Sequence, residues 1–171
     1  MPRTEFDCFR LAGIDPNRLI FLDETWIKTN MTRLWGWRPC GERVLDYTPY
    51  GHWMTTTYLA AMRSTGLFAP LVIDGARNSE IFRSYVQPHL ALQLKAGDLV
   101  LMDNLPSHQV SGVAEAIRSV GVKLVYLPPY SPDKNPIEIV LSKVKNEIRK
   151  QAPQLHSPRR LRETRGKMNM L

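Results

Sequence analysis

Two short apolar runs without polar alternation constrain the fold of this chain more than any other feature. Residues 19–22 read Leu-Ile-Phe-Leu, residues 99–102 read Leu-Val-Leu-Met, and an aspartate directly follows each run. A strand with one face in water alternates polar and apolar side chains, whereas a strand buried on both faces does not. Both runs therefore predict central strands of a sheet that is covered by helices.

The order of the other patterns indicates how this sheet is built. Segments rich in β-branched and aromatic residues predict three further strands, 52–62, 67–73 and 122–127. Helical spacing of apolar residues predicts helices at 81–90, 110–117 and 135–150. Pro88 should kink the first of these helices, and 35–44 is typical of a hairpin. An early meander followed by alternating strands and helices predicts an α/β domain, with a mixed central sheet of about five strands and helices on both faces.

Length and composition fit one domain. The chain has 171 residues, of which 43% are hydrophobic, enough for a single core. We expect a lead-in at 1–17, the domain at 18–150 and a basic tail at 151–171. Without an apolar run of about 20 residues or a signal peptide, we expect a cytoplasmic protein with no membrane partner. Cys8 and Cys40 are too few for a disulfide framework or a zinc site.

The charge of the chain indicates an anionic partner. The net charge is +7 and the pI is about 9.6, which favours nucleic acid. The tail supplies much of this charge, since it holds one acid, Glu163, and five basic residues, which are Arg159, Arg160, Arg162, Arg165 and Lys167. A solvated terminus has the same composition, so composition permits a nucleic-acid protein without proving one.

Three acids are candidates for a metal site. Asp23 and Asp103 follow buried strands, and ligands of open α/β sheets bind beyond the carboxyl ends of strands. Glu138 stands at the start of the last predicted helix. Carboxylate oxygens suit Mg²⁺ or Mn²⁺, and two such ions about 4 Å apart can assist phosphodiester chemistry.

Each acid also has a purely structural interpretation. Asp23 could cap a loop, and Asp103 with Asn104 is a common turn pair. Asn135 as N-cap and Glu138 at the third helical position would form a capping box that any helix can use. The local sequence of each acid alone leaves both interpretations open.

The sequence around these acids resembles the mariner superfamily of DDE transposases, most closely its bacterial insertion-sequence branch. The segments that carry the resemblance are 21–26 (Phe-Leu-Asp-Glu-Thr-Trp), 101–104 with His108, and 127–138. The last segment places four prolines in nine positions, at Pro128, Pro129, Pro132 and Pro136. The 34 residues between Asp103 and Glu138 match the spacing of that branch.

The resemblance implies a ribonuclease-H-like fold, with Asp23 on the first strand, Asp103 at the fourth and Glu138 on the last helix. It implies that these three residues are catalytic and hold two Mg²⁺ or Mn²⁺ ions. Water would cleave a phosphodiester at the transposon end, and the freed 3′-hydroxyl would then attack target DNA. The partners are thus transposon ends and target DNA, the setting is the bacterial nucleoid, and a homodimer is an option.

The chain departs from that family at three places. Leu141 replaces a bulky aromatic residue, fewer than twenty residues precede the first strand where the family has helix-turn-helix units, and the sequence after Lys150 changes character. We therefore allow for a separately encoded N-terminal helix-turn-helix polypeptide. Two alternatives stay open: a catalytically idle DNA-binding remnant of a truncated transposase, and a general ribonuclease-H-like nuclease that would leave the proline block unexplained.

Five residues are candidates for contact with DNA. They are Lys28, Arg33, His108, Lys143 and Lys145. Basic groups contact phosphates, but an exposed hairpin, a polar helix start or a solvated helix face would explain the same residues. The tryptophans at 35, 37 and 53 are expected in the core or on a sheet face.

Overall fold

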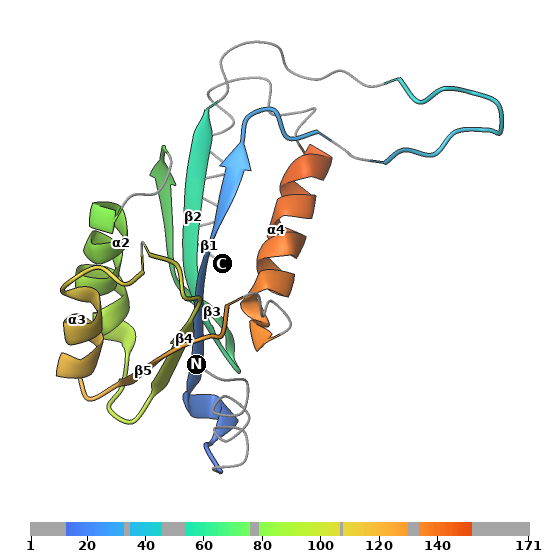
Figure 1. The fold of residues 1–171 in the computed structure, drawn as a ribbon. Coiled ribbons are helices and arrows are strands. Elements are labelled where there is room, and N and C mark those ends of the chain that lie inside the picture. Colours follow the sequence, from blue (N-terminus) through green and yellow to red (C-terminus); the bar gives the residue numbers. More distant parts are fainter. Residues whose placement is uncertain are drawn as a thin grey trace.

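A single five-stranded sheet forms the centre of the computed structural model, which describes residues 13–32, 35–45, 54–75, 79–106, 108–129 and 134–151 (Figure 1). The strand order is β3-β2-β1-β4-β5. The strands are β1 (Leu19–Lys28), β2 (Thr55–Arg63), β3 (Gly66–Asp74), β4 (Leu99–Met102) and β5 (Lys123–Tyr126). β1 pairs antiparallel with β2 and parallel with β4. The predicted mixed sheet of five strands is confirmed.

β1 is longer than the sequence pattern indicates, and this corrects the expectation that Asp23 ends the strand. The strand continues to Lys28 because β2 supplies partners along its whole length, as far as the pair Lys28↔Thr55. Its parallel partner β4 stops earlier, at the pair Leu22↔Met102. Asp23 therefore lies within β1, at the point where the neighbouring strand ends.

Helices cover both faces of the sheet (Figure 1). On one face lie α2 (Ser79–Tyr85), η2 (Val86–Leu90), η3 (Ala91–Gln93) and α3 (Val113–Ser119), and on the other lies α4 (Ile137–Gln151). A short helix, η1 (Pro16–Arg18), precedes β1. η2 is a π-helical turn that contains Pro88, so the regular α-helix predicted for 81–90 ends at Tyr85 and gives way to π-helical geometry around this proline.

Alternation along β1 divides its side chains between two apolar clusters. Ile20 and Leu22 are fully buried beneath α2 and α3, in the larger cluster. Ile27 belongs to the cluster on the α4 face, together with Ile137 and Leu141 of that helix. Because successive side chains of a strand point to opposite faces, Asp23 shares the α4 face with Ile27, and Glu24 shares the opposite face with Leu22.

Residues 35–45 project away from the sheet in Figure 1. A turn at Glu42, whose amide donates to the Pro39 carbonyl, is present, but these residues form no strand. Trp35 and Trp37 are 88% and 99% exposed, so their expected place in the core is wrong. Arg33 and Trp53 lie outside the described residues. No helix in the described part of the chain has the length and apolar character needed to cross a membrane.

Candidate active site

Asp23 and Asp103 are brought together by strand register. β1 and β4 pair in parallel through Leu22↔Met102, and each aspartate is the next residue along its chain. Neighbouring strands lie about 4.8 Å apart, so the two carboxylates start from adjacent backbone positions. The order of strands in the sheet, and not proximity in sequence, creates this pair.

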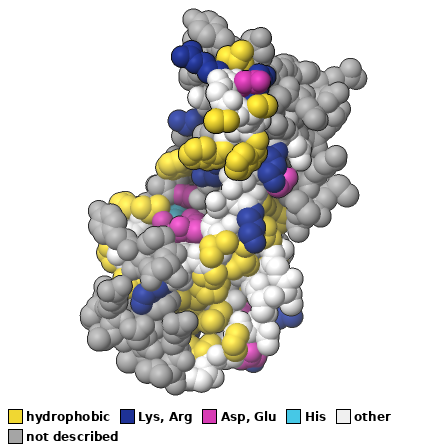
Figure 2. All heavy atoms as spheres, turned by 90° about the vertical axis from the view of Figure 1, so that its right-hand side faces the viewer, with side chains coloured by type: hydrophobic (Ala, Val, Ile, Leu, Met, Phe, Trp, Pro, Cys, Tyr) yellow, Lys and Arg dark blue, Asp and Glu magenta, His cyan; other side chains and the backbone are white. Residues whose placement is uncertain are grey.

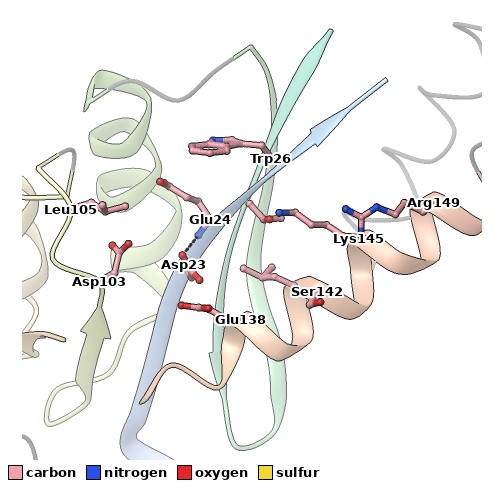
Figure 3. A pocket seen from close by; sticks show the side chains of 11 residues that line it. Asp23, Glu24, Trp26, Asp103, Leu105, Glu138, Ser142, Lys145 and Arg149 are labelled. Atoms are coloured by element: carbon pink, nitrogen blue, oxygen red, sulfur yellow. Dashed lines mark hydrogen bonds between the residues drawn. The ribbon is translucent and has the colours of Figure 1, made fainter. Parts of the chain in front are cut away.

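Glu138 reaches the same place because α4 packs beside β1. Ile137 is fully buried and Leu141 is 3% exposed, and both contact the apolar cluster on this face of the sheet. Their burial fixes the rotation of the helix and turns Glu138 toward Asp23, as Figure 3 shows.

Asn135 connects the start of α4 directly to Asp23. The side chain of Asn135 is 1% exposed, and its Nδ2 donates to Oδ2 of Asp23 at 3.4 Å. The capping box that was the structural interpretation of Glu138 would place this side chain on the helix backbone, and it lies instead against the carboxylate of Asp23. The helix begins at Ile137, one residue later than that arrangement requires. The backbone oxygen of Asn135 still accepts from the amide of Glu138 at 3.1 Å.

The three acids line one cavity of about 450 Å³ (Figure 3). The lining residues are Asp23, Glu24, Thr25, Trp26, Asp103, Leu105, Glu138, Leu141, Ser142, Lys145 and Arg149. In the space-filling view of the α4 side, acidic side chains gather in one hollow, with Lys and Arg side chains and a large hydrophobic area beside it (Figure 2). The cavity thus joins an acidic floor to a partly basic wall on α4.

The electrostatic environment of Asp23 is that of a crowded carboxylate. Burial raises the pKa of Asp23 from 3.8 to about 7, and the charges of Asp103 and Glu138 add to this effect. His108 and Lys145 oppose it. The amide of Glu24 donates to Oδ1 of Asp23 at 2.7 Å, which stabilises the ionised form locally.

Two other groups of the cavity have perturbed pKa values. Burial raises the pKa of Glu138, and the charge of Asp103 raises it further. Burial lowers the pKa of Lys145, and nearby Arg149 lowers it further, while Asp23 acts in the opposite direction. Perturbed groups in one cavity are typical of functional sites.

The chemistry of these donors fits a hard divalent cation. Three carboxylates that repel one another are stabilised when a cation neutralises them, and oxygen ligands suit Mg²⁺ or Mn²⁺. In the described residues as they stand, no group of three His, Cys, Asp or Glu side chains is close enough to hold a metal ion. Ion binding would therefore have to draw the carboxylates together.

The candidates for DNA contact divide into four groups. Lys28 at the end of β1 and Lys143 on α4 are exposed, and Lys145 lines the cavity. Arg33 lies outside the described residues. His108 is 0% exposed, so its ring has no surface to offer DNA and the expected contact is not supported.

The structure adds residues that the sequence did not single out as part of the site. Glu24 and Ser142 line the cavity, and Asn135 holds Asp23. The sequence signals for Glu24 and Asn135 were their positions inside two of the segments that carry the resemblance, 21–26 and 127–138. Nothing in the local pattern indicates which way their side chains point.

Comparisons with known proteins agree with this fold. Residues 18–161 match the family model described as DDE superfamily endonuclease. A Mos1 transposase paired-end complex with left transposon end aligns with a TM-score of 0.64 at 15% identity, covering 85% of this chain and 46% of the other. The catalytic domain of Mos1 mariner transposase aligns with a TM-score of 0.60 at 15% identity, covering 96% and 75%. A mariner Mos1 paired-end complex with Mg aligns at 0.62 and 18% identity, covering 84% and 47%.

At these identities the solved structures show the fold alone, and that fold is the ribonuclease-H-like fold expected from the sequence. The chain spans about half the length of the transposase chains in the paired-end complexes. The search of curated proteins found no match.

Proposed function

Since the chain belongs to the DDE superfamily endonucleases, we propose that it is the catalytic core of an insertion-sequence transposase, which cleaves DNA strands and transfers them with the help of divalent metal. The observation that carries this proposal is the meeting of Asp23, Asp103 and Glu138 at one cavity. They come from two adjacent strands and from a helix that packs beside them.

Asp23, Asp103 and Glu138 would hold two Mg²⁺ or Mn²⁺ ions. Bound there, such ions would activate the attacking oxygen and neutralise the charge on the leaving oxygen of a phosphodiester. The raised pKa of Asp23, about 7, supports this assignment because burial and the charges of Asp103 and Glu138 disfavour its ionised form, which a bound cation would stabilise.

The other lining residues suit a nucleic-acid substrate. Lys145 and Arg149 stand on the α4 wall of the cavity, where their charges would hold a phosphate close to the carboxylates. Trp26, which is 47% exposed, presents an aromatic face at the same cavity, and such faces stack on unpaired bases. DNA would thus lie across the mouth of the cavity between β1 and α4.

The reaction sequence follows from the family. Water attacks a phosphodiester at the transposon end, leaving a free 3′-hydroxyl, and that hydroxyl then attacks a phosphodiester of target DNA. Each step exchanges one phosphorus–oxygen bond for another, so no redox partner is required. We further propose membership of the bacterial insertion-sequence branch, action at the nucleoid, a separately encoded helix-turn-helix polypeptide as a partner, and assembly as a homodimer.

The first test compares Asp103→Asn and Glu138→Gln with wild type. We expect Mn²⁺ to raise the unfolding temperature of the wild type, since an ion that binds only the folded state stabilises it. Both variants should lose this shift and any Mn²⁺-dependent cleavage of terminal-repeat DNA. Glu147→Gln is the matched control, because Glu147 is an exposed acid on the same helix that pairs with Lys150.

Two results would count against the proposal. Unchanged cleavage in Asp103→Asn would remove Asp103 from the site. DNA binding without cleavage in the wild type, with Mn²⁺ present, would favour the alternative of a catalytically idle DNA-binding remnant.

A further inference from the structure

A buried histidine contacts the carboxylate of Asp103. The ring of His108 is 0% exposed, and its Nδ1 lies directly against Oδ1 of Asp103 and 3.4 Å from the backbone oxygen of the same residue. On the opposite side of the ring, Nε2 lies 3.2 Å from Oε2 of Glu24. The histidine thus joins two acidic residues that line the cavity, and both of its ring nitrogens are engaged by carboxylates.

The orientation of this ring is fixed by its surroundings. The ring stacks on Phe82 of α2, with centroids 4.2 Å apart and an interplanar angle of 25°. The backbone of His108 is held at both polar atoms: its amide donates to the Leu105 carbonyl at 2.9 Å, and its carbonyl accepts from the Tyr126 hydroxyl at 3.3 Å. A ring held in this way presents a rigid partner to Asp103.

Asp103 has few other means of holding its position. β4 ends at Met102, so no ladder of strand hydrogen bonds extends to Asp103. Its side chain is 32% exposed, whereas that of Glu24 is only 4% exposed. A carboxylate on a loop samples several rotamers unless a neighbour selects one, and that freedom must be lost when the group binds an ion.

Glu24 is the buried one of the two acids that contact His108. Alternation along β1 turns Asp23 toward α4 and turns the next residue, Glu24, toward α2 and His108. Consecutive residues of one strand therefore carry two different tasks. Asp23 faces the other carboxylates from one side, and Glu24 supports the histidine that contacts Asp103 from the other side.

We infer that His108, held by Glu24 and Phe82, is a positioning residue that orients the carboxylate of Asp103 for binding the divalent ion. This role rests on the proposed function, because it takes Asp103 to be a metal ligand. Residues that hydrogen-bond to metal ligands orient them, and removing such a partner typically lowers metal affinity about 10–100-fold.

The test measures Mn²⁺ binding by the full chain, using the electron paramagnetic resonance signal of free Mn²⁺. His108→Ala should weaken the affinity about 10–100-fold. His108→Asn should keep most of the wild-type affinity. The amide nitrogen of Asn is bonded to Cγ, as Nδ1 of His is, and it can still donate to Asp103. His108→Gln places its amide one bond farther out, toward Glu24, and should bind as weakly as the alanine variant.

Tyr85→Phe is the matched control. It removes a buried hydroxyl of α2 that donates to the Ala69 carbonyl at 2.8 Å and leaves His108 and its contacts in place. We expect the Mn²⁺ affinity of this variant to equal that of the wild type. Unfolding temperatures in EDTA are recorded for every variant. If His108 had only a structural role, its substitutions would lower these temperatures, but His108→Asn and His108→Gln would bind Mn²⁺ with the same affinity.

Several results would overturn the inference. Wild-type Mn²⁺ affinity in His108→Gln, with Asp103→Asn inactive in the same assay, would show that the contact does not position the ligand. A loss in Glu24→Gln as complete as in Asp103→Asn would identify Glu24 as a ligand itself. If His108→Ala does not fold, the Mn²⁺ affinities of His108→Asn and His108→Gln test the inference by themselves.

Failure of the proposed function has a different signature. A wild-type protein that does not bind Mn²⁺ would refute the metal site, and the positioning role would fall with it. Double-mutant coupling between His108 and Asp103, measured by urea unfolding in EDTA, would then still show the contact itself. Mn²⁺ binding without any such coupling would overturn the inference alone.

Discussion

At the scale of single residues, Asp23 shows how the fold sets the chemistry of an ordinary side chain. Its surroundings combine partial burial, two neighbouring acids and a hydrogen bond from the Glu24 amide. Burial and like charges disfavour the ionised form more than this single hydrogen bond favours it, so the pKa rises to about 7. The cluster is therefore poised to exchange a proton for a cation near neutral pH.

This shift predicts how stability without metal depends on pH. Between about pH 4 and 7 the folded state keeps the proton of Asp23 that the unfolded state, with a pKa near 3.8, releases, so stability falls as pH rises through this window. Asp23→Asn removes the effect. Its gain in unfolding free energy over wild type should be about 2.6 kcal/mol larger at pH 8 than at pH 5, since the effect grows by about 1.9 pKa units over this interval and one unit corresponds to about 1.4 kcal/mol.

Urea unfolding in EDTA at both pH values measures this difference. At pH 8, added Mn²⁺ should raise the unfolding free energy of the wild type but not that of the variant. If Asp23→Asn changed the unfolding free energy equally at the two pH values, the pKa of the Asp23 carboxylate would not be shifted.

At the scale of elements, helix α4 determines whether the site is complete. The helix is amphipathic: Ile137 is fully buried against the sheet, and Ile139, two residues on, is 63% exposed. Glu138 lies between them and reaches the cavity edge because Ile137 and Leu141 fix the rotation of the helix. The position of the third acid thus depends on apolar packing and not on any bond made by the acid itself.

Two alanine substitutions on this helix compare the loss of a buried isoleucine side chain with the loss of an exposed one. Ile137→Ala should cost about 3 kcal/mol of unfolding free energy, the usual range for removing a buried isoleucine side chain. It should also weaken Mn²⁺ binding, because Glu138 loses its fixed position. Ile139→Ala should change stability by less than about 0.5 kcal/mol, as exposed substitutions do. Chemical denaturation and Mn²⁺ titration of both variants test this, and equal effects at the two positions would contradict the packing shown.

At the scale of the whole molecule, charge is unevenly placed around the sheet. The acidic cluster lies where β4 ends, and the basic residues Lys145 and Arg149 stand beside it on α4. Lys123, at the first position of β5, lies at the other end of the short parallel strands. A DNA phosphate that approaches the carboxylates from the α4 side would therefore meet Lys145 and Arg149.

This arrangement predicts weak DNA binding that depends on salt and little on sequence. Lys145→Ala should lower the slope of log affinity against log salt by about 1, since each phosphate contact contributes about 0.9 to the slope. Lys123→Ala, a charge-matched control, should leave the slope unchanged. Titrations of terminal-repeat and scrambled DNA at two salt concentrations measure both effects. A preference for the repeat of about 100-fold or more would show that this chain carries sequence readout of its own.

Much of the fold was predictable because its signals are local. An unbroken apolar run marks a buried strand wherever it occurs, and 99–102 became β4 without adjustment. The alternation of strands and helices in the second half of the chain likewise requires parallel pairing and helices on both faces. The two aspartates stood out in the sequence because each directly follows an apolar run, whereas the pairing of β1 with β4 and the continuation of β1 to Lys28 were seen only in the structure.

The sequence by itself thus determined the class of fold, the order of its elements and the three acids that line the cavity. Only the tertiary structure decided what those acids touch. Glu24 meets a histidine 84 residues away, and Asn135 meets Asp23 across 112 residues. Periodicity within a segment reports which face of that segment is buried. It holds no information on the partner that a distant segment supplies, and this partner sets the pKa, the rotamer and the role of each side chain.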